Sequence, residues 1–235
     1  MGPNKILLGT GGWHYLPHGL ADYTKKFGFV EVNSTFYNIF HPSAIESWRR
    51  SVPDRFEFSI KCYSGLTHNI GPRPTEDAFR VFDLMVRYCD LLEAKVLVLE
   101  SPAFTKLDEK FVDQARSFFG SVSLRDNALR IAWEFRRNTS EMPDSVISFM
   151  KDFHMIHVVD LTFEDPRFET DILYSRVFGA PAKKNILDLN DLNNIKEKVH
   201  ASNSDTAYIV GHSLKMVDDT EKIRDILFDP SNRLD

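Results

Sequence analysis

The sequence predicts an α/β protein whose single domain, residues 1–235, folds as a (β/α)8 TIM-type barrel. Eight short apolar runs with strand character alternate with helical patterns, which is typical of a parallel sheet covered by helices. The length of 235 residues fits one such barrel. Polar residues also recur at the carboxyl ends of the strands, where barrel enzymes place their active sites.

An open, doubly wound sheet is the alternative architecture. It normally needs a phosphate-binding loop or a crevice where the strand order reverses. Residues 9–12 (Gly-Thr-Gly-Gly) follow the first strand, but they lack the G-x-G-x-x-G spacing of such a loop. Residues 13–15 (Trp-His-Tyr) do not resemble the start of a helix. The closed barrel is therefore the simpler interpretation.

The predicted strands are apolar runs bounded by turn residues. They comprise residues 5–10, 29–33, 56–61, 95–100, 130–135, 154–161, 172–178 and 206–211. No linker, low-complexity segment or repeat separates them, so we expect one domain.

Helices are predicted between the strands from helical spacing of apolar residues and from capping residues. They comprise residues 20–27, 42–50, 75–93, 108–119, 144–153, 191–201 and 216–228. Ser43 is the expected N-cap of the second helix and Thr75 that of the third. Residues 164–171, after the sixth strand, are too short and too interrupted by proline for a full helix.

Composition excludes several classes of protein. The formal net charge of −5 gives no overall bias towards nucleic acid or anionic membranes, although local basic patches leave a nucleic-acid partner open. No apolar run approaches a membrane span, and the first eight residues lack the apolar core of a signal peptide. The two cysteines form no disulfide framework. We expect a reduced, cytoplasmic protein without a membrane partner.

Residues 29–37 (Phe-Val-Glu-Val-Asn-Ser-Thr-Phe-Tyr) begin as a strand and end as a polar cluster. Because a strand alternates its faces, Val30 and Val32 point one way and Glu31 and Asn33 the other. A carboxylate on the inner side of a strand costs free energy unless it is paired or used. This segment therefore indicates a site at the end of the second strand.

The same alternation places polar side chains on the inner face at the ends of other strands. The set comprises Glu31, Asn33, Lys61, Glu100, Glu134, Arg136, Asp160, Arg176 and His212. Ion pairs that rigidify the mouth of a barrel explain any single member. Convergence from several strands favours a functional site, because so many charges gathered by chance would be unstable.

Several chemistries fit this set. Glu31 and Glu134 can act as acid and base, their pKa values separated by Lys61 and Arg136. A desolvated Lys61 can act as a nucleophile. Arg136, Arg176 and Lys61 can clamp a phosphate or a carboxylate.

A divalent metal held by carboxylates with His68 or His212 is a further alternative. No H-E-x-x-H motif or Cys-His cluster supports zinc, and the inward Lys and Arg residues compensate the carboxylates without a metal. We therefore expect neither a metal nor a cofactor.

Aromatic residues gather near the same strand ends, at Trp13, Tyr15, Phe36 and Tyr37. Loop packing explains them, and a stacking wall for a sugar or a base is the functional alternative. His68, in the loop after the third strand, is either a hydrogen-bonding loop residue or an acid-base residue.

Four segments carry a resemblance to a known family. They are residues 9–15 (GTGGWHY), 30–37 (VEVNSTFY), 56–61 (FEFSIK) with 66–68 (LTH), and 133–136 (WEFR). In order and spacing they resemble the YecE-like family, also called domain of unknown function 72. The resemblance spans most of the chain. It implies a TIM-type barrel, and no reaction is established for the family.

The positions that match the family pattern are carried over residue by residue. They are Gly9, Trp13, Tyr15, Glu31, Asn33, Ser34, Thr35, Phe36, Tyr37, Lys61, Thr67, His68, Glu134 and Arg136, with Asp160 resembling the family's Asp after strand six. Residues 174–179 resemble its Tyr-Val-Arg-Leu-His-Gly, with Phe178 where His is usual. Glu100 and His212 also depart from the pattern, in place of the usual Gln-Leu-Pro-Pro and Asn-rich turn.

These observations predict an enzyme that uses acid-base chemistry on a small polar or anionic substrate, as a hydrolase, lyase or isomerase. The expected catalytic residues are Glu31, Glu134 and Lys61. The expected substrate-binding residues are Trp13, Tyr15, Asn33, Tyr37, His68, Arg136, Asp160 and Arg176. The alternatives are a non-catalytic module that binds a small ligand or nucleic acid, and a structural role in which the charges are ion pairs. The sequence leaves the oligomeric state open.

Overall fold

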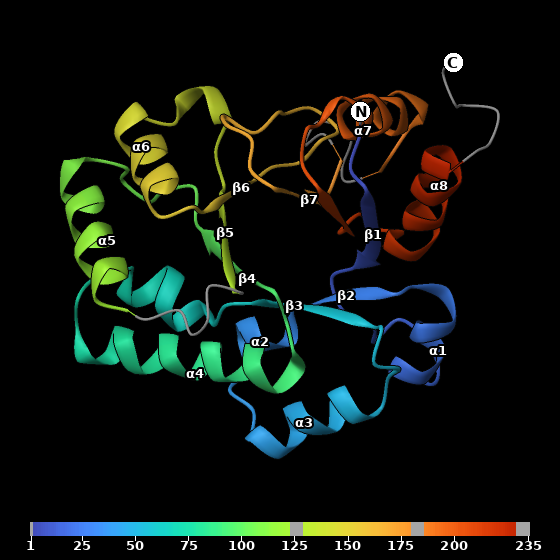
Figure 1. The fold of residues 1–235 in the computed structure, drawn as a ribbon, viewed down its shortest axis with the longest axis horizontal. Coiled ribbons are helices and arrows are strands. Elements are labelled where there is room, and N and C mark those ends of the chain that lie inside the picture. The colour runs from blue at the N-terminus through green and yellow to red at the C-terminus, as the bar shows by residue number, and fades with distance from the viewer. Residues whose placement is uncertain (1, 123–128, 180–185, 229–235) are drawn as a thin grey trace.

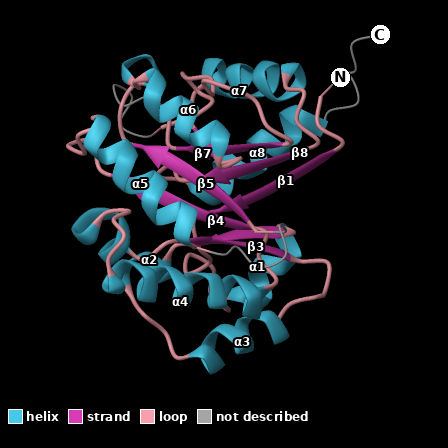
Figure 2. Ribbon diagram, turned by 60° about the vertical axis from the view of Figure 1, so that its left-hand side comes forward, coloured by secondary structure: helices cyan, strands magenta, loops and turns pink. Residues whose placement is uncertain are grey.

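The computed structural model describes residues 2–122, 129–179 and 186–228. Its strands lie at the centre and its helices lie around them (Figures 1 and 2). The strands are β1 (Lys5–Thr10), β2 (Phe29–Val32), β3 (Glu57–Lys61), β4 (Val96–Ser101), β5 (Arg130–Phe135), β6 (Ile156–Val158), β7 (Ile172–Val177) and β8 (Thr206–Gly211). The predicted alternation of strands and helices is confirmed.

The helices connect successive strands. They are α1 (Leu20–Lys26), α2 (Ser34–Tyr37), α3 (Pro42–Arg50), α4 (Glu76–Leu92), α5 (Glu109–Ser121), α6 (Asp144–Asp152), α7 (Leu189–Ala201) and α8 (Met216–Phe228). A π-helix, η1 (Gly65–Ile70), and a 3-10 helix, η3 (Thr139–Glu141), are added at strand ends. No helix in the described ranges is long and apolar enough to cross a membrane.

All strand pairs are parallel, and they form two sheets, in the orders β2-β3-β4-β5-β6 and β1-β8-β7. Single parallel bridges join the sheets at both seams: Gly11 to Glu31 between β1 and β2, and Val159 to Ser175 between β6 and β7. The strands therefore follow one another in a ring, with a reduced ladder at each seam. The fold is α/β with parallel sheets, as the sequence predicts.

The strand alternation separates two apolar layers. One cluster gathers inward-facing residues from six strands, among them Phe29, Val98, Ala132 and Tyr174. Residues of the opposite strand faces pack against the helices in a larger cluster that includes Val30 and other outward positions. Since side chains two apart share a face, the residue that follows Phe29 on the inner side is Glu31. The charged layer thus lies directly above an apolar one.

Several local predictions need correction. The N-cap of α3 is His41, whose Nδ1 accepts from the backbone N–H of Ser43, so Ser43 is already inside the helix. Thr75 is the cap of α4, as expected, and accepts from the backbone N–H of Ala78. β6 is shorter than residues 154–161, and it begins after His154, whose positive φ of 50° is not an extended conformation. The connection from β6 to β7 contains turns and no helix, as predicted.

Candidate functional site

Arg176, from β7, lies at the centre of the charged layer and is 1% exposed. Its Nε is 3.1 Å from Glu31 Oε1, and its Nη1 is 2.6 Å from Glu100 Oε2. The same Nη1 pairs with Glu134 Oε2. Three carboxylates, from β2, β4 and β5, therefore converge on one guanidinium, whose planar set of donors suits several partners at once.

Glu31 is fully buried and held from three sides. Tyr174 donates its hydroxyl hydrogen to Glu31 Oε2 over 2.9 Å, and Ser59 Oγ lies 2.7 Å from Tyr174 Oη. His212 Nε2 is 3.0 Å from Glu31 Oε1, close enough to donate from the tautomer protonated at Nε2. Burial alone would raise the pKa of Glu31, but Arg176, His212 and Lys61 lower it to about 2.

Gly11 makes room for this arrangement. A Cβ atom built on Gly11 would lie 2.2 Å from His212 Cε1 and 2.4 Å from Asn33 Nδ2. Any side chain here would therefore push His212 away from Glu31, or displace Asn33, which follows β2 directly. Packing around His212 and Asn33 therefore explains the glycine at position 11.

Glu100 and Glu134 are register partners on neighbouring strands, so their carboxylates lie side by side. Two cations offset their repulsion. Arg136 places Nη2 3.0 Å from Glu100 Oε2 and Nε 3.2 Å from Glu134 Oε1, and Arg176 contacts both carboxylates. Burial would raise the pKa of Glu100, but Arg176, Lys61 and Arg136 together lower it. The layer balances three carboxylates with three cations, and we call these six residues, with His212, the ion cluster.

Lys61 ends β3 and is 4% exposed. Its Nζ is 2.9 Å from Glu100 Oε2 and 3.8 Å from the centre of the Phe36 ring. Burial and the Arg176 guanidinium lower the pKa of Lys61, while Glu100 opposes this shift. A lysine whose pKa is lowered in this way has more of its neutral, nucleophilic amine at neutral pH than a solvated lysine has.

His68 lies on η1, beside the ion cluster. Its Nε2 is 3.8 Å from Glu100 Oε1, its Nδ1 is 2.9 Å from Thr67 Oγ1, and its ring packs edge-on against Phe36. Burial lowers the pKa of His68, which favours the neutral imidazole at neutral pH. Single π-turns are often found at functional sites, and this one carries His68 to the cluster.

A cavity of about 710 Å³ opens over the ends of β5, β6 and β7. It is lined by Glu134 and Arg136 from the ion cluster, and by Asp160, Glu164 and Phe178 from the loops. The Arg136 side chain is 38% exposed and that of Glu134 11%. Glu134 and Arg136 are therefore the cluster residues that a ligand in this cavity would meet. We call this cavity the mouth pocket.

Asp160 holds loops in place at the edge of the mouth pocket. Its Oδ1 accepts from the backbone N–H and the hydroxyl of Thr162, and its Oδ2 accepts from the backbone N–H groups of Phe178 and Gly179. Burial raises the pKa of Asp160 against these four hydrogen bonds. The residue thereby ties the turn after β6 to the turn after β7.

The predicted aromatic and polar ligands divide into two groups. Trp13 is 6% exposed and packs edge-on against Trp48, within the outer core. Tyr15 is 63% exposed and Tyr37 70% exposed, outside the ion cluster. The structure therefore brings together Glu31, Lys61, His68, Glu134, Arg136 and Arg176, places Asn33 against Gly11, and leaves Trp13, Tyr15 and Tyr37 apart.

Two residues of the ion cluster's surroundings, Tyr174 and Glu164, were not among the predicted site residues. Tyr174 shares the inner face of β7 with Arg176, so strand alternation alone could have indicated it. Glu164 lies in a loop, where no periodicity marks it. Burial raises the pKa of Glu164, and the charges of Asp160 and Glu134 act in the same direction.

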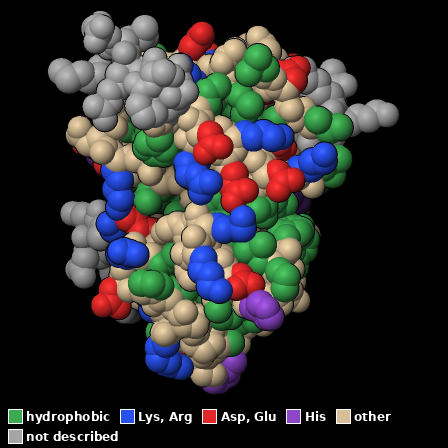
Figure 3. Space-filling model, turned by 90° about the vertical axis from the view of Figure 1, so that its right-hand side faces the viewer, with side chains coloured by type: hydrophobic (Ala, Val, Ile, Leu, Met, Phe, Trp, Pro, Cys, Tyr) green, Lys and Arg blue, Asp and Glu red, His purple; other side chains and the backbone are tan. Residues whose placement is uncertain are grey.

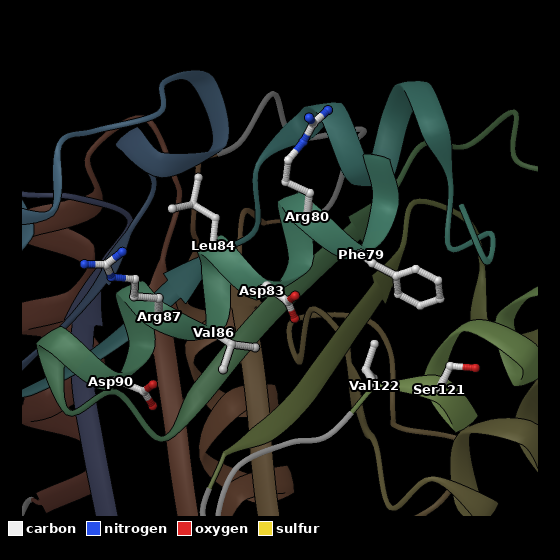
Figure 4. A pocket seen from close by; sticks show the side chains of 9 residues that line it. All are labelled: Phe79, Arg80, Asp83, Leu84, Val86, Arg87, Asp90, Ser121 and Val122. Atoms are coloured by element: carbon white, nitrogen blue, oxygen red, sulfur yellow. The ribbon is translucent and has the colours of Figure 1, made fainter. Parts of the chain in front are cut away.

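The structure also has a larger hollow, of about 860 Å³, along α4 and the end of α5 (Figure 4). It is lined by Phe79, Val86 and Val122 together with charges of both signs, including Asp83 and Arg87. None of the strand-end residues lines it. In the described part of the chain, no group of three His, Cys, Asp or Glu side chains is arranged to hold a metal ion.

Comparison with known proteins places the chain in a family. A family model described as "Protein of unknown function DUF72" matches residues 9–224. The chain belongs to this family. The UPF0759 protein YunF of Bacillus subtilis (strain 168) is 26% identical over 148 residues, which are 60% of this chain and 51% of YunF. The chain thus spans about half the length of this curated relative.

Solved structures share the fold. A DUF72 family protein from Thermotoga maritima MSB8 superposes with a TM-score of 0.72 at 18% identity, covering 95% of this chain and 99% of the other. A D-tagatose 3-epimerase-like protein superposes with a TM-score of 0.59 at 15% identity, covering 95% and 97%. At these identities the likeness establishes the architecture, which is that of TIM-barrel-like proteins.

Proposed function

We propose that this DUF72 protein is an enzyme that uses acid-base chemistry on a small polar or anionic substrate in the mouth pocket. The observation that carries the proposal is the position of Glu134. Its carboxylate lines the pocket, and Arg176 and Arg136 fix its orientation from two sides. A fixed carboxylate at the wall of a cavity is suited to take up or deliver a proton at one defined atom of a substrate.

The other cluster residues support Glu134 in different ways. Glu31 is fully buried and ionised, so in this proposal it is a positioning residue that holds Arg176 and His212 rather than an acid or base. Lys61 does not line the mouth pocket, so in this proposal it holds Glu100 and is not the group that transfers the proton. Glu164, which also lines the mouth pocket, is the candidate acid, since burial and the charges of Asp160 and Glu134 raise its pKa.

The reaction class follows from two carboxyl groups with different environments around one cavity. Glu134 is held by cations, whereas Glu164 is half-buried near other carboxylates. Such a pair suits hydrolases, lyases and isomerases, in which one group removes a proton and another donates one. The exposed guanidinium of Arg136 beside Glu134 favours substrates with a carboxylate or phosphate.

Free, buried Cys62 and Cys89 support a cytoplasmic location.

The experiment is a turnover screen with the wild-type protein and Glu134→Gln. Both are incubated with a panel of sugars, sugar phosphates and carboxylate esters, and product formation is followed by NMR. We expect wild type to convert a member of the panel and Glu134→Gln to lose at least about 100-fold in rate, the scale of one general acid-base group. Glu197→Gln, which removes an exposed carboxylate on α7, is the matched control.

The result that contradicts the proposal is equal turnover by wild type and Glu134→Gln on a substrate that wild type converts. Binding of a panel member without conversion at any pH would favour the non-catalytic module instead. In that case the ligand should raise the melting temperature of both proteins.

A further inference from the structure

A second cavity opens on the other side of the ion cluster, between η1 and the connection from β4 to α5. It has a volume of about 440 Å³, and we call it the outer groove. Thr67, His68, Arg73, Lys106 and Lys110 are among the residues that line it. Because His68 Nε2 is 3.8 Å from Glu100 Oε1, the groove adjoins the ion cluster at His68.

Three cations that line the outer groove, Arg73, Lys106 and Lys110, have no carboxylate partner within residues 2–122, 129–179 and 186–228. Each is exposed. On the face formed by α1 and α8, by contrast, Lys26 pairs with Glu221, and basic and acidic side chains are interspersed (Figure 3). Three uncompensated cations in one concave site attract an anion, because the field of like charges adds there.

Among the described residues that line the outer groove, Asp108 carries a carboxylate. It is the N-cap of α5, and its Oδ1 accepts from the backbone N–H of Phe111 over 2.9 Å. Its charge offsets one of the three cations, so the lining keeps an excess of positive charge. The neutral side chains of Asn69 and Gln114 add hydrogen-bonding groups without charge.

Phe104 gives the outer groove an apolar surface. Its ring is 79% exposed and lines the same cavity as the cations. An aromatic ring exposed to this extent, beside cations, is suited to cover the organic part of a ligand whose other end is anionic. A volume near 440 Å³ falls in the range of sites for small molecules. The net charge of −5 opposes the many phosphate contacts of a nucleic-acid strand.

We propose that the outer groove binds a small phosphate ester, with Arg73, Lys106 and Lys110 on the phosphate and Phe104 on the organic part. This goes beyond the proposed function, whose substrate lies in the mouth pocket, and it does not rest on that function. Two kinds of ligand share the required chemistry, a sugar phosphate and a mononucleotide. The binding itself does not require turnover.

Isothermal titration calorimetry tests the proposal, with glucose 6-phosphate, AMP and inorganic phosphate as probes. We expect at least one ester to bind wild type, more weakly as salt rises, and Arg73→Gln and Lys106→Gln each to raise its Kd about three- to tenfold. Arg87→Gln is the matched control, because it removes an exposed cation from α4, on the hollow of Figure 4. It should leave the Kd unchanged.

The ester that binds more tightly indicates which kind of ligand the outer groove recognises. Tighter binding of AMP than of glucose 6-phosphate, with the difference removed by Phe104→Ala, indicates a nucleotide. Equal or tighter binding of glucose 6-phosphate indicates a sugar phosphate. Both results support the proposal, and the same titrations on Glu134→Gln keep it separate from catalysis, since that variant should bind as wild type does.

Three results would overturn the proposal. One is the absence of binding by both esters to wild type at low salt. Another is a Kd that Arg73→Gln and Lys106→Gln leave unchanged, or that Arg87→Gln raises equally. The third is far tighter binding of a single-stranded oligonucleotide than of AMP. That result would show that the ligand is a nucleic acid and not a small ester.

Discussion

The ion cluster and the outer groove lie side by side at the carboxyl ends of the strands, yet the charges of the cluster are paired and mostly buried, whereas the cations of the groove are exposed and, in the described part of the chain, unpaired. In the cluster, Arg176 is 1% exposed and each charge meets a partner. In the groove, Arg73 and its neighbouring lysines are exposed and lack carboxylate partners in the described structure. Paired buried charges fix geometry, whereas unpaired exposed charges are free to bind a ligand. The comparison predicts that variants in the two regions affect different properties.

Removal of the central cation should have the largest effect. Arg176→Met leaves Glu31, Glu100 and Glu134 facing one another in a buried layer without their shared partner. We expect the free energy of unfolding to fall by about 3–5 kcal/mol, as for other broken buried ion pairs. Urea unfolding measures it. Because this variant can fail to fold, Arg176→Lys, which keeps the charge, should lose less, and equal stability of Arg176→Met and wild type would contradict the paired cluster.

Glu31→Gln should come next, with a characteristic dependence on pH. The pKa of Glu31 is about 2 in the folded protein against 4.5 as the ordinary value. Since the folded pKa is lowered, the stabilisation is complete above about pH 4.5 and is lost as pH falls towards 2, and its size is about 3 kcal/mol. Glu31→Gln should therefore lower stability at pH 7 and flatten its fall between pH 4.5 and 2. An unchanged slope in urea unfolding across that window would count against the assignment.

Tyr174→Phe should have a smaller effect. It removes the hydroxyl that donates to Glu31 and adjoins Ser59, so one buried carboxylate oxygen loses a donor. A loss of about 1–2 kcal/mol is expected in thermal or urea unfolding. Tyr37→Phe is the control, because Tyr37 is 70% exposed and should tolerate the change. Equal effects of the two substitutions would mean that the Tyr174 hydroxyl does not support Glu31.

Arg136→Gln should have the smallest effect on stability, although Arg136 belongs to the ion cluster. Its side chain is 38% exposed, so solvent screens its pairs with Glu100 and Glu134. We expect a change of no more than about 1 kcal/mol in urea unfolding. Turnover of an anionic substrate should nevertheless fall, because Arg136 faces the mouth pocket. A stability loss as large as that of Arg176→Met would show that exposure does not separate the two arginines.

Period-two alternation explains why much of the cluster was predictable from the sequence. Phe29 and Glu31 share the inner face of β2, and the same rule brings Glu134 and Arg176 inward. Alternation predicts the face of the strand on which a side chain lies, but it does not predict how deeply that side chain is buried. It therefore could not show that Glu31 is sealed beneath Arg176 whereas Glu134 reaches the mouth pocket.

Loop geometry explains what the sequence left open. The groove cations Arg73, Lys106 and Lys110 come from two connections that are far apart in the chain, without a periodic pattern to link them. The π-helix that carries His68 has no sequence signature comparable to a strand. Trp13 matched the family pattern, but its ring packs into the core against Trp48, since aromatic residues serve packing as readily as binding.

The most direct test of this division is one urea-unfolding series on wild type, Glu31→Gln and Arg73→Gln, each with and without the phosphate ester that binds best. The free energy without ligand reports the ion cluster, and the increase with ligand reports the outer groove. We predict that Glu31→Gln loses stability and keeps the ligand-induced increase, and that Arg73→Gln keeps stability and loses the increase. A ligand-induced increase that survives Arg73→Gln but disappears in Glu31→Gln would contradict the account.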